Sequence, residues 1–384
     1  SYVVLDGSEM QGYYQNGLVN QALIWEKVKE FDFGVDFSVF DNRISLTADV
    51  YRRLSDGQIM DRTVPLETGE KTSTFNIGSV RNTGIELGLQ VGVIRTKDFN
   101  WDLNMSFSRN WNKILELSNG KVDEVASNRF IGEPLNVLRD YLHTDVITDK
   151  GVTMKTKDGD IHYTLQEVYQ KYGWHEGQIG VHDWDNNGKI DDNDKQIFGC
   201  TDPKWMGSLT STMNYKDFDL SIMLYTKQGQ WSRSYFHERY LQYNDRGSQH
   251  MDFDYYIPKG TPVIDHNTGD IVYTTETHYG KYPYPTQSDA TAGGYFGDRG
   301  SAADEGWRYH KTSFVKVKNI CLGYTFPKQW ISKAGLQHLR LYLNVINPFC
   351  FTNYEGFDPE WASARLTDGG PASITYQIGA NIKF

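Results

Sequence analysis

The chain has 384 residues, and its 39 Lys and Arg against 49 Asp and Glu give a formal net charge of −10. This acidic balance argues against a general nucleic-acid-binding protein, which shows a basic surplus or a basic stripe. No run approaches the ~20 consecutive apolar residues of a membrane-spanning helix, whereas a membrane β-barrel, with its alternating strands, is not excluded. The 14% aromatic content, 36 Gly and only 11 Pro favour many strands and turns.

Alternation of apolar and polar residues with a period of two predicts amphipathic strands along the whole chain. It is clearest in nine segments: residues 31–40, 43–51, 84–95, 99–110, 206–215, 218–227, 313–326, 338–349 and 374–384. In the last segment every second residue is apolar, and the residues between are polar or glycine. The phase of the alternation shifts within 313–326, so we expect a β-bulge near Lys318 and Asn319.

The connections between these strands differ greatly in length. Short turns are predicted around Asp41, Lys97 and Lys216, because Asn and Asp beside them suit tight hairpins. Long polar segments make the other connections: residues 53–83, 112–204, 228–312 and 350–373. Outer-membrane barrels have short periplasmic turns and long extracellular loops, so we expect Phe384 at the periplasmic rim. A helix over residues 164–172 fits inside the second long segment.

The pattern therefore predicts an all-β fold, an antiparallel transmembrane β-barrel with long extracellular loops. The alternative is a soluble β-sandwich whose sheets each have one wet face. Many strands sharing one pattern, with loops so unequal, favour the barrel. The apolar row from residue 374 to 384 distinguishes the two folds, since it faces lipid in a barrel and packs under a second sheet in a sandwich.

Several stretches resemble the SusC/RagA family of TonB-linked outer-membrane transporters. Gly78-Ser79-Val80-Arg81-Asn82-Thr83-Gly84-Ile85-Glu86 matches that family's G-x-V-x-N-x-G-hydrophobic-E signature. Further stretches follow in the family's order: residues 23–26, 40–45, 99–101, 110–113, 215–220, 313–320, 339–342, 347–349 and 356–360. The resemblance rests on this ordered set, which runs from about residue 20 to 384.

The resemblance implies that residues 1–384 are the C-terminal part of a 22-stranded barrel in a transporter of roughly 1,000 residues, located in the bacterial outer membrane. It also implies partners: a SusD-like surface lipoprotein that lids the barrel, and TonB, which acts through a plug region absent from this sequence. The imported substrate is an oligosaccharide or a peptide. Residues 112–204 and 228–312 are then extracellular loop regions. We identify no catalytic residues and expect no enzymatic activity.

Residues 183–194 match the calcium-loop pattern D-x-D-x-N-G-x-I-x-x-x-D. The expected oxygen ligands are the side chains of Asp183, Asp185, Asn187 and Asp194, the carbonyl of Lys189, and Asp191 through water. Hard oxygen ligands suit Ca²⁺, while Mg²⁺ demands a tighter octahedron. The alternative is an acidic turn that needs no metal. If calcium binds, we expect it to stiffen a long extracellular loop.

Residues 231–309 are dense in aromatic side chains, which can stack on sugars or fill a protein interface. The expected contacts with substrate or the SusD-like partner are Trp231, Tyr235, Phe236, Tyr240 and Trp307. The alternative is that these rings pack the loop's own small core. Two other functions are alternatives. One is a secreted, calcium-stabilised, glycan-binding β-sandwich. The other is a passive porin, a class of protein that lacks the ordered family motifs.

Overall fold

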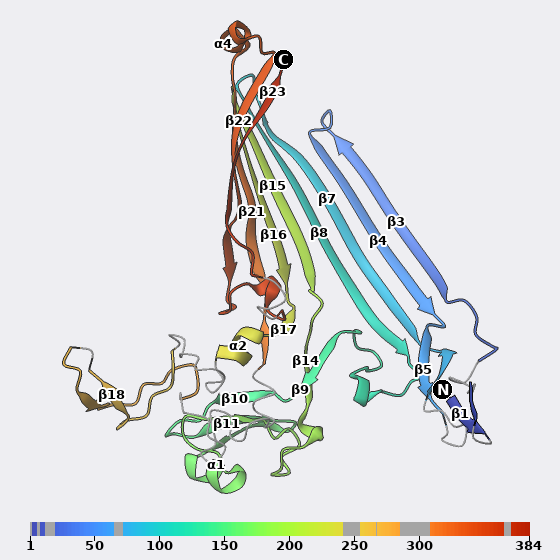
Figure 1. The fold of residues 1–384 in the computed structure, drawn as a ribbon, viewed down its shortest axis with the longest axis vertical. Helices are drawn as coiled ribbons and strands as arrows, with labels where there is room; N and C mark the ends of the chain where they lie inside the picture. The colour runs from blue at the N-terminus through green and yellow to red at the C-terminus, as the bar shows by residue number, and fades with distance from the viewer. Residues whose placement is uncertain are drawn as a thin grey trace. The chain divides into compact units, whose positions relative to one another are not determined.

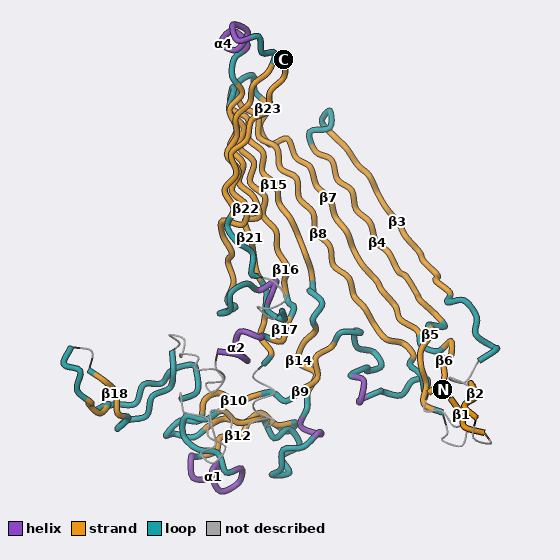
Figure 2. Tube along the Cα trace, viewed as in Figure 1, coloured by secondary structure: helices purple, strands orange, loops and turns teal. Residues whose placement is uncertain are grey.

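The computed structural model describes residues 2–5, 8–11, 20–64, 72–240, 254–265, 267–284, 308–364 and 370–384. Strands dominate this part of the chain, and its helices are short (Figure 2). None of these helices is long and apolar enough to cross a membrane. The chain divides into two units, Ser1–Arg95 with Trp101–Val137 and Thr96–Asn100 with Leu138–Phe384.

The first unit is built on four long antiparallel strands, which neighbour one another in the order β8-β7-β4-β3 (Figure 1). They are β3 (Lys27–Val39), β4 (Ile44–Asp56), β7 (Ser79–Arg95) and β8 (Phe99–Glu116). Short strands β1 (Tyr2–Leu5), β2 (Ser8–Gln11), β5 (Ile59–Thr63) and β6 (Thr72–Asn76) form two further hairpins. The predicted turn between β3 and β4 is confirmed, because Asp41 and Asn42 have φ of 54° and 61°.

One face of this unit is apolar across three neighbouring strands. Val35 pairs with Ala48, which pairs with Leu87, and Phe37, Leu46 and Leu89 form the next row. Phe33 and Phe37 on β3 are 60% and 55% exposed. The rows therefore join into one apolar surface with no layer of the described chain packed over it.

The second unit holds five more long strands: β15 (Trp205–Tyr215), β16 (Phe218–Gln228), β21 (Phe314–Thr325), β22 (His338–Thr352) and β23 (Thr375–Lys383). Each follows its neighbour in antiparallel order (Figure 1). With the four of the first unit, these are the nine strands that the sequence predicts. Most of the strands extend beyond the predicted bounds at the long-loop ends, as β7 and β8 do at Ser79 and Glu116, whereas β21 and β23 lie within their predicted bounds.

The predicted bulge is confirmed in β21. Met223 pairs with Asn319 and Leu224 with Val317, so Lys318 has no partner in β16. The extra residue returns the apolar side chains on both sides of it to one face. On β22, Pro348 lies in the same break of register, where its missing N–H costs no ladder hydrogen bond.

On one side of the bulge, apolar rows run unbroken across four strands. One row is Leu220, Leu322, Leu343 and Ile378, and the next is Ile222, Ile320, Val345 and Tyr376. Between them, on the opposite face, lies the row Ser221, Cys321, Asn344 and Gln377. Ile378 is 88% exposed. In the described part of the chain no second sheet covers this face, so the arrangement is that of a membrane barrel strand and not of a sandwich.

Residues of the two long loop regions fold into small two-stranded sheets. Four are antiparallel: β10 (His143–Val146) with β13 (Ile179–Val181), β11 (Val152–Thr156) with β12 (Gly159–Tyr163), β17 (Trp231–Arg233) with β20 (Tyr309–Lys311), and β18 (Pro262–Ile264) with β19 (Ile271–Tyr273). The fifth pairs β9 (Val137–Asp140) with β14 (Gln196–Cys200). The helices are α1 (Leu165–Tyr172), α2 (Tyr235–Tyr240), α4 (Lys328–Ile331) and the 3₁₀ turns η2 (Val125–Ser127), η3 (Asp192–Asp194), η4 (Ser332–Ala334) and η5 (Pro359–Trp361).

Helix α1 confirms the helix expected over residues 164–172. Thr164 and Glu167 form a capping box at its start, and Gly173 with φ of 74° ends it. Its Val168 is buried with Met154 in one small core.

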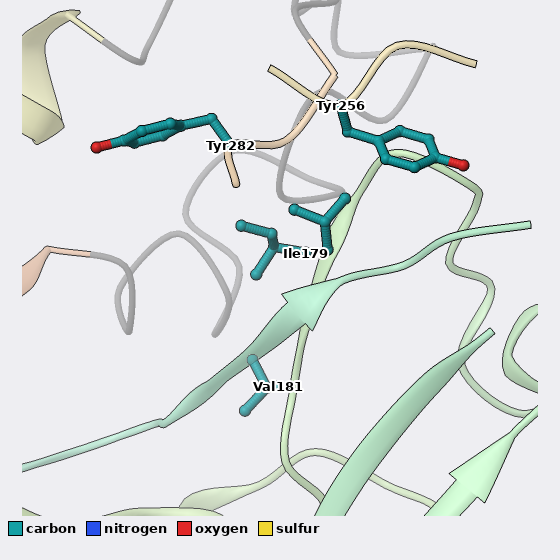
Figure 3. Packing of buried hydrophobic residues seen from close by; sticks show 5 residues of the cluster. Ile179, Val181, Tyr256 and Tyr282 are labelled. Carbon is teal, nitrogen blue, oxygen red and sulfur yellow. The ribbon is translucent and has the colours of Figure 1, made fainter. Parts of the chain in front are cut away.

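The second small core joins the two long loop regions. Ile179, from the first region, packs with Tyr256 and Tyr282, from the second (Figure 3). These tyrosines are 0% and 2% exposed. Part of the aromatic density between residues 231 and 309 therefore packs a core shared by both loop regions.

Candidate metal-binding loop and the aromatic residues

The acidic loop at residues 183–194 connects β13 to β14 and ends in the 3₁₀ turn η3. It reverses direction at Asn186 and Gly188, whose φ angles of 57° and 81° lie in the left-handed region that Gly and Asn tolerate best. Ile190 packs against the core that contains Ile179. The Ile190 side chain thus attaches the loop to the folded part of the chain.

Three carboxylates of this loop converge. One oxygen each from Asp183, Asp185 and Asp194 lies within 4.8 Å of the others. Asp183 and Asp194 are both 1% exposed. Buried carboxylates are costly unless hydrogen bonds or positive charge compensate them, so the surroundings of these two side chains decide what the loop can bind.

Backbone N–H groups provide much of that compensation. Asp183 accepts hydrogen bonds from the N–H of Asn187 at 3.0 Å and of Gly188 at 2.8 Å. Asp194 accepts from the N–H of Trp184 at 2.7 Å and of Asp191 at 2.8 Å. The loop backbone is therefore wrapped around the carboxylate oxygens, which keeps them facing one another.

The two buried carboxylates differ in their protonation tendency. Burial acts to raise the pKa of Asp183, but hydrogen bonds from Tyr172 and Gly188 and the charge of Lys171 hold it below its ordinary value. Burial raises the pKa of Asp194, against the hydrogen bonds it accepts. Lys171 Nζ lies 3.5 Å from Asp183 Oδ2. The three carboxylates carry more negative charge than this one ammonium group neutralises. Their hard oxygens are a donor set that fits Ca²⁺.

The remaining predicted ligands have other contacts. The Asn187 side chain donates to Asp185 Oδ2 at 2.9 Å and accepts from the Lys189 N–H at 2.8 Å. Asp191 accepts from the N–H of Asn193 at 2.8 Å and caps η3, so its carboxylate lies outside the group of three. The sequence analysis did not find Tyr172, whose hydroxyl donates to Asp183 at 2.7 Å, because it belongs to a separate helix.

The aromatic residues singled out from the sequence have different surroundings. The Trp231 ring is partly exposed and lies against Phe198, with ring centroids 5.3 Å apart. Phe236 is 8% exposed and packs on Phe357 at 4.9 Å, and the N–H of Tyr235 bonds to the Ala362 carbonyl at 2.9 Å. The side chain of Tyr240 and all of Trp307 lie outside the described residues.

A buried polar cluster next to Phe236 was not found from the sequence. Ser234 Oγ lies 2.6 Å from His237 Nδ1 and 2.6 Å from the Tyr354 hydroxyl. The His310 ring stacks on His237 with centroids 3.6 Å apart. Burial, together with His310 and Lys281, lowers the pKa of His237 to about 2, so the ring is neutral. Ser234 also accepts from the His237 N–H at 3.3 Å, an arrangement that stabilises the start of α2.

Known proteins match the chain over nearly its whole length. A family model described as TonB dependent receptor-like, beta-barrel matches residues 5–348. TonB-dependent receptor P3 of Formosa agariphila is 26% identical over 411 residues, which covers 100% of this chain and 36% of that protein. TonB-dependent receptor SusC of Bacteroides thetaiotaomicron is 27% identical over 374 residues, which covers 95% of this chain and 32% of that protein.

Solved structures share the fold. A chain in the structure of the RagAB peptide transporter aligns with a TM-score of 0.66 and 19% identity, covering 100% of this chain and 38% of that chain. A chain of the RagAB peptide importer in the 'open-open' state aligns with a TM-score of 0.64 and 21% identity, covering 96% and 36%. This chain thus spans about a third of the length of the curated relatives it matches.

Proposed function

The chain belongs to the TonB-dependent receptor-like β-barrel family, and from this we propose that it forms C-terminal strands of a SusC/RagA-type transporter in the bacterial outer membrane. The complete transporter imports a nutrient, an oligosaccharide or a peptide, with energy delivered by TonB. The observation that carries the proposal is the row of apolar partners from Leu220 to Ile378, exposed on one face of the sheet. Such a face suits contact with hydrocarbon.

The opposite face suits a hydrated passage. Asn344 joins Asn319 and Gln377 in a ladder of amide hydrogen bonds at 2.5 and 3.0 Å. Arg340 forms an ion pair with Asp219 at 2.5 Å, with both side chains partly exposed. Polar side chains that hydrogen-bond with one another suit a water-filled lumen, while the outer face of a barrel is apolar.

A lysine substitution at Ile378 tests the assignment of the two faces. In the full-length transporter refolded into lipid vesicles, we expect Ile378→Lys to lower the free energy of unfolding by about 2–4 kcal/mol, the cost of a lysine in the bilayer interior. Gln377→Lys, at the same depth on the other face, is the matched control and loses only one amide hydrogen bond, about 1 kcal/mol. Equal effects at both positions would contradict the proposal, because an 88% exposed residue in a water-soluble sheet tolerates lysine.

Partner and substrate follow from the same proposal. The SusD-like lipoprotein lids the extracellular mouth, and the plug that contacts TonB lies outside this sequence. RagAB is named as a peptide transporter, which favours the peptide alternative, and the name of the SusC relative specifies no substrate. Uptake of fluorescent oligosaccharides and peptides in the native bacterium, with and without tonB, decides between them. Uptake that persists without TonB indicates a passive porin instead.

We also propose that the acidic loop binds Ca²⁺ through Asp183, Asp185 and Asp194, because their oxygens converge in a hard donor set in which Asp183 and Asp194 are buried. Bound calcium would add positive charge where one ammonium group faces three carboxylates. Its role is to hold the connection between β13 and β14 rigid.

Terbium luminescence measures this binding, since Tb³⁺ replaces Ca²⁺ and Trp184 lies next to the first ligand in the loop. We expect tryptophan-sensitised Tb³⁺ emission that added Ca²⁺ displaces, and at least tenfold weaker binding in Asp183→Asn. Asp192→Asn is the control, because this carboxylate, with a 63% exposed side chain, pairs with Lys195 and Arg139 and not with the group of three. Unchanged emission in Asp183→Asn would contradict the assignment.

A further inference from the structure

A cavity of about 410 Å³ lies within the second unit, between strands of the two long loop regions. This volume falls within the range of small-ligand pockets in proteins. Its lining has two distinct parts: polar side chains from β10, β11 and β12, and aromatic side chains from β14, β17 and β20. Neither part was recognisable in the sequence, because the contributing residues are scattered between positions 142 and 309 and share no local pattern.

Strand alternation places the polar side chains in the cavity. On β11, Val152 and Met154 are buried in the core, so the alternate residues Thr153 and Lys155 lie on the other face and line the cavity. Lys155 pairs in register with Asp160 on β12. The polar wall therefore presents hydroxyl, ammonium and carboxylate groups from adjacent strands.

Two histidines extend this wall as neutral groups. The Lys155 N–H donates to His182 Nδ1 at 3.0 Å, which leaves the proton of the neutral ring on Nε2. Burial lowers the pKa of His182 to about 4, so the ring is uncharged at neutral pH. His143, which also lines the cavity, contacts the Thr144 carbonyl through Nδ1 at 2.8 Å.

The aromatic wall consists of Phe198, Trp231 and Tyr309. Phe198 contacts both other rings, with centroid distances of 5.3 and 5.4 Å. The Trp231 indole lies over Gly199, where a Cβ would come within 2.5 Å of the ring. Gly199 thus creates the space for the indole and sets its position.

We propose that this cavity binds one neutral pyranose unit of an oligosaccharide. The apolar C–H face of a sugar ring stacks on aromatic side chains, and its hydroxyls hydrogen-bond with carboxylate, ammonium and imidazole groups opposite. The carboxylates of Asp145 and Asp160 are balanced by the ammonium of Lys155 in the lining and that of Lys311, which lies 5.4 Å from the Trp231 ring, and this balance suits a neutral sugar. A metal site is a poor alternative, because in the described residues only the acidic loop brings three such ligands together.

The inference rests on the proposed function for its role in import, but binding itself is measured without transport. Isothermal titration of the detergent-purified, full-length transporter uses neutral malto-, xylo-, manno- and galacto-oligosaccharides as probes. We expect one series to bind, and Trp231→Ala and Asp160→Asn each to weaken that binding about tenfold or more, a loss of about 1.4 kcal/mol per tenfold.

Trp25→Ala and Asp158→Asn are matched controls, since both residues are exposed and neither lines the cavity. They are expected to bind as the unsubstituted protein does, and all variants should elute as the folded species. Binding of none of the sugars, or affinities unchanged in both cavity variants, overturns the cavity assignment while leaving TonB-dependent import intact. If the transporter binds random peptides and no sugar, and Trp231→Ala abolishes that peptide binding, the assignment of a sugar as the ligand is overturned.

Discussion

Deletion of Lys318 is expected to abolish assembly of the transporter in the outer membrane. Lys318 is the unpaired residue of the bulge in β21, and without it the residues that follow turn to the opposite face. Ile320 and Leu322 would then face the lumen, and Asn319 would face lipid. At about 1.5–3 kcal/mol for each large apolar side chain moved into water, Ile320 and Leu322 together cost about 3–6 kcal/mol. The Asn319 amide moved into lipid adds its own desolvation cost, so the total is comparable with the whole stability of a marginally stable fold.

Membrane fractionation with a heat-modifiability assay measures this effect. The matched control is Lys318→Ala, which keeps the extra residue and loses the contacts of Lys318 with Glu360 at 2.8 Å and with the Tyr225 ring at 5.5 Å. It should assemble at a level close to that of the unsubstituted protein. A deletion variant that assembles normally would show that the bulge does not set the phase of β21.

Replacement of Lys316 by Met is expected to lower the free energy of unfolding by about 3–5 kcal/mol, the cost of leaving a buried charge uncompensated. The Lys316 side chain is 3% exposed, and its Nζ donates to Asp358 Oδ1 at 2.6 Å and to Glu360 Oε2 at 2.6 Å. Asp358 is itself 6% exposed, so its carboxylate cannot turn to water. Chemical denaturation of the detergent-solubilised transporter measures the change.

Two further variants make this prediction specific. Lys316→Met combined with Asp358→Asn removes both charges of the buried pair and should recover part of the lost stability. Lys328→Met removes an exposed lysine and should change stability by no more than about 0.5 kcal/mol. A loss below about 1 kcal/mol in the single variant would contradict the role assigned to this buried ion pair.

The ion pair also explains two stretches of the family resemblance in physical terms. Lys316 belongs to the stretch at residues 313–320, and Asp358 and Glu360 belong to the stretch at residues 356–360. Asp358 additionally caps η5 by accepting from the Glu360 N–H at 2.9 Å. The two motifs contact each other through this ion pair. The ion pair holds a long loop against a barrel strand, which gives both motifs a structural role.

The parts of the fold that were predictable are those with local signals. Period-two alternation gave the nine long strands, and the phase shift gave the bulge at Lys318. Helix α1 begins with the capping-box residues Thr164 and Glu167, which are a local signal of a helix start. The pairs of three- to five-residue strands in the loop regions were not predictable, because their pairing depends on contacts such as Ile179 with Tyr256. Such contacts join residues far apart in sequence, and short strands carry no periodicity of their own.

The same distinction holds for the candidate sites. Convergence of Asp183, Asp185 and Asp194 follows from spacing within twelve residues, so the sequence could indicate it. Tyr172 and Lys171 come from a neighbouring helix, and no local pattern links them to the loop. Trp231 was noticed for its aromatic ring, but the polar wall opposite it, including Asp160, is brought there only by the tertiary fold.

Spin-label accessibility at two adjacent residues of β23 tests the central claim most directly. The three cysteines of this chain form no disulfide, so a transporter with its cysteines replaced can carry a nitroxide at Ile378→Cys or at Gln377→Cys. In lipid vesicles we predict that the label at 378 collides mainly with dissolved oxygen, which concentrates in the bilayer, and the label at 377 mainly with a water-soluble nickel complex. Preference for the nickel complex at both positions would contradict the assignment of this face to lipid.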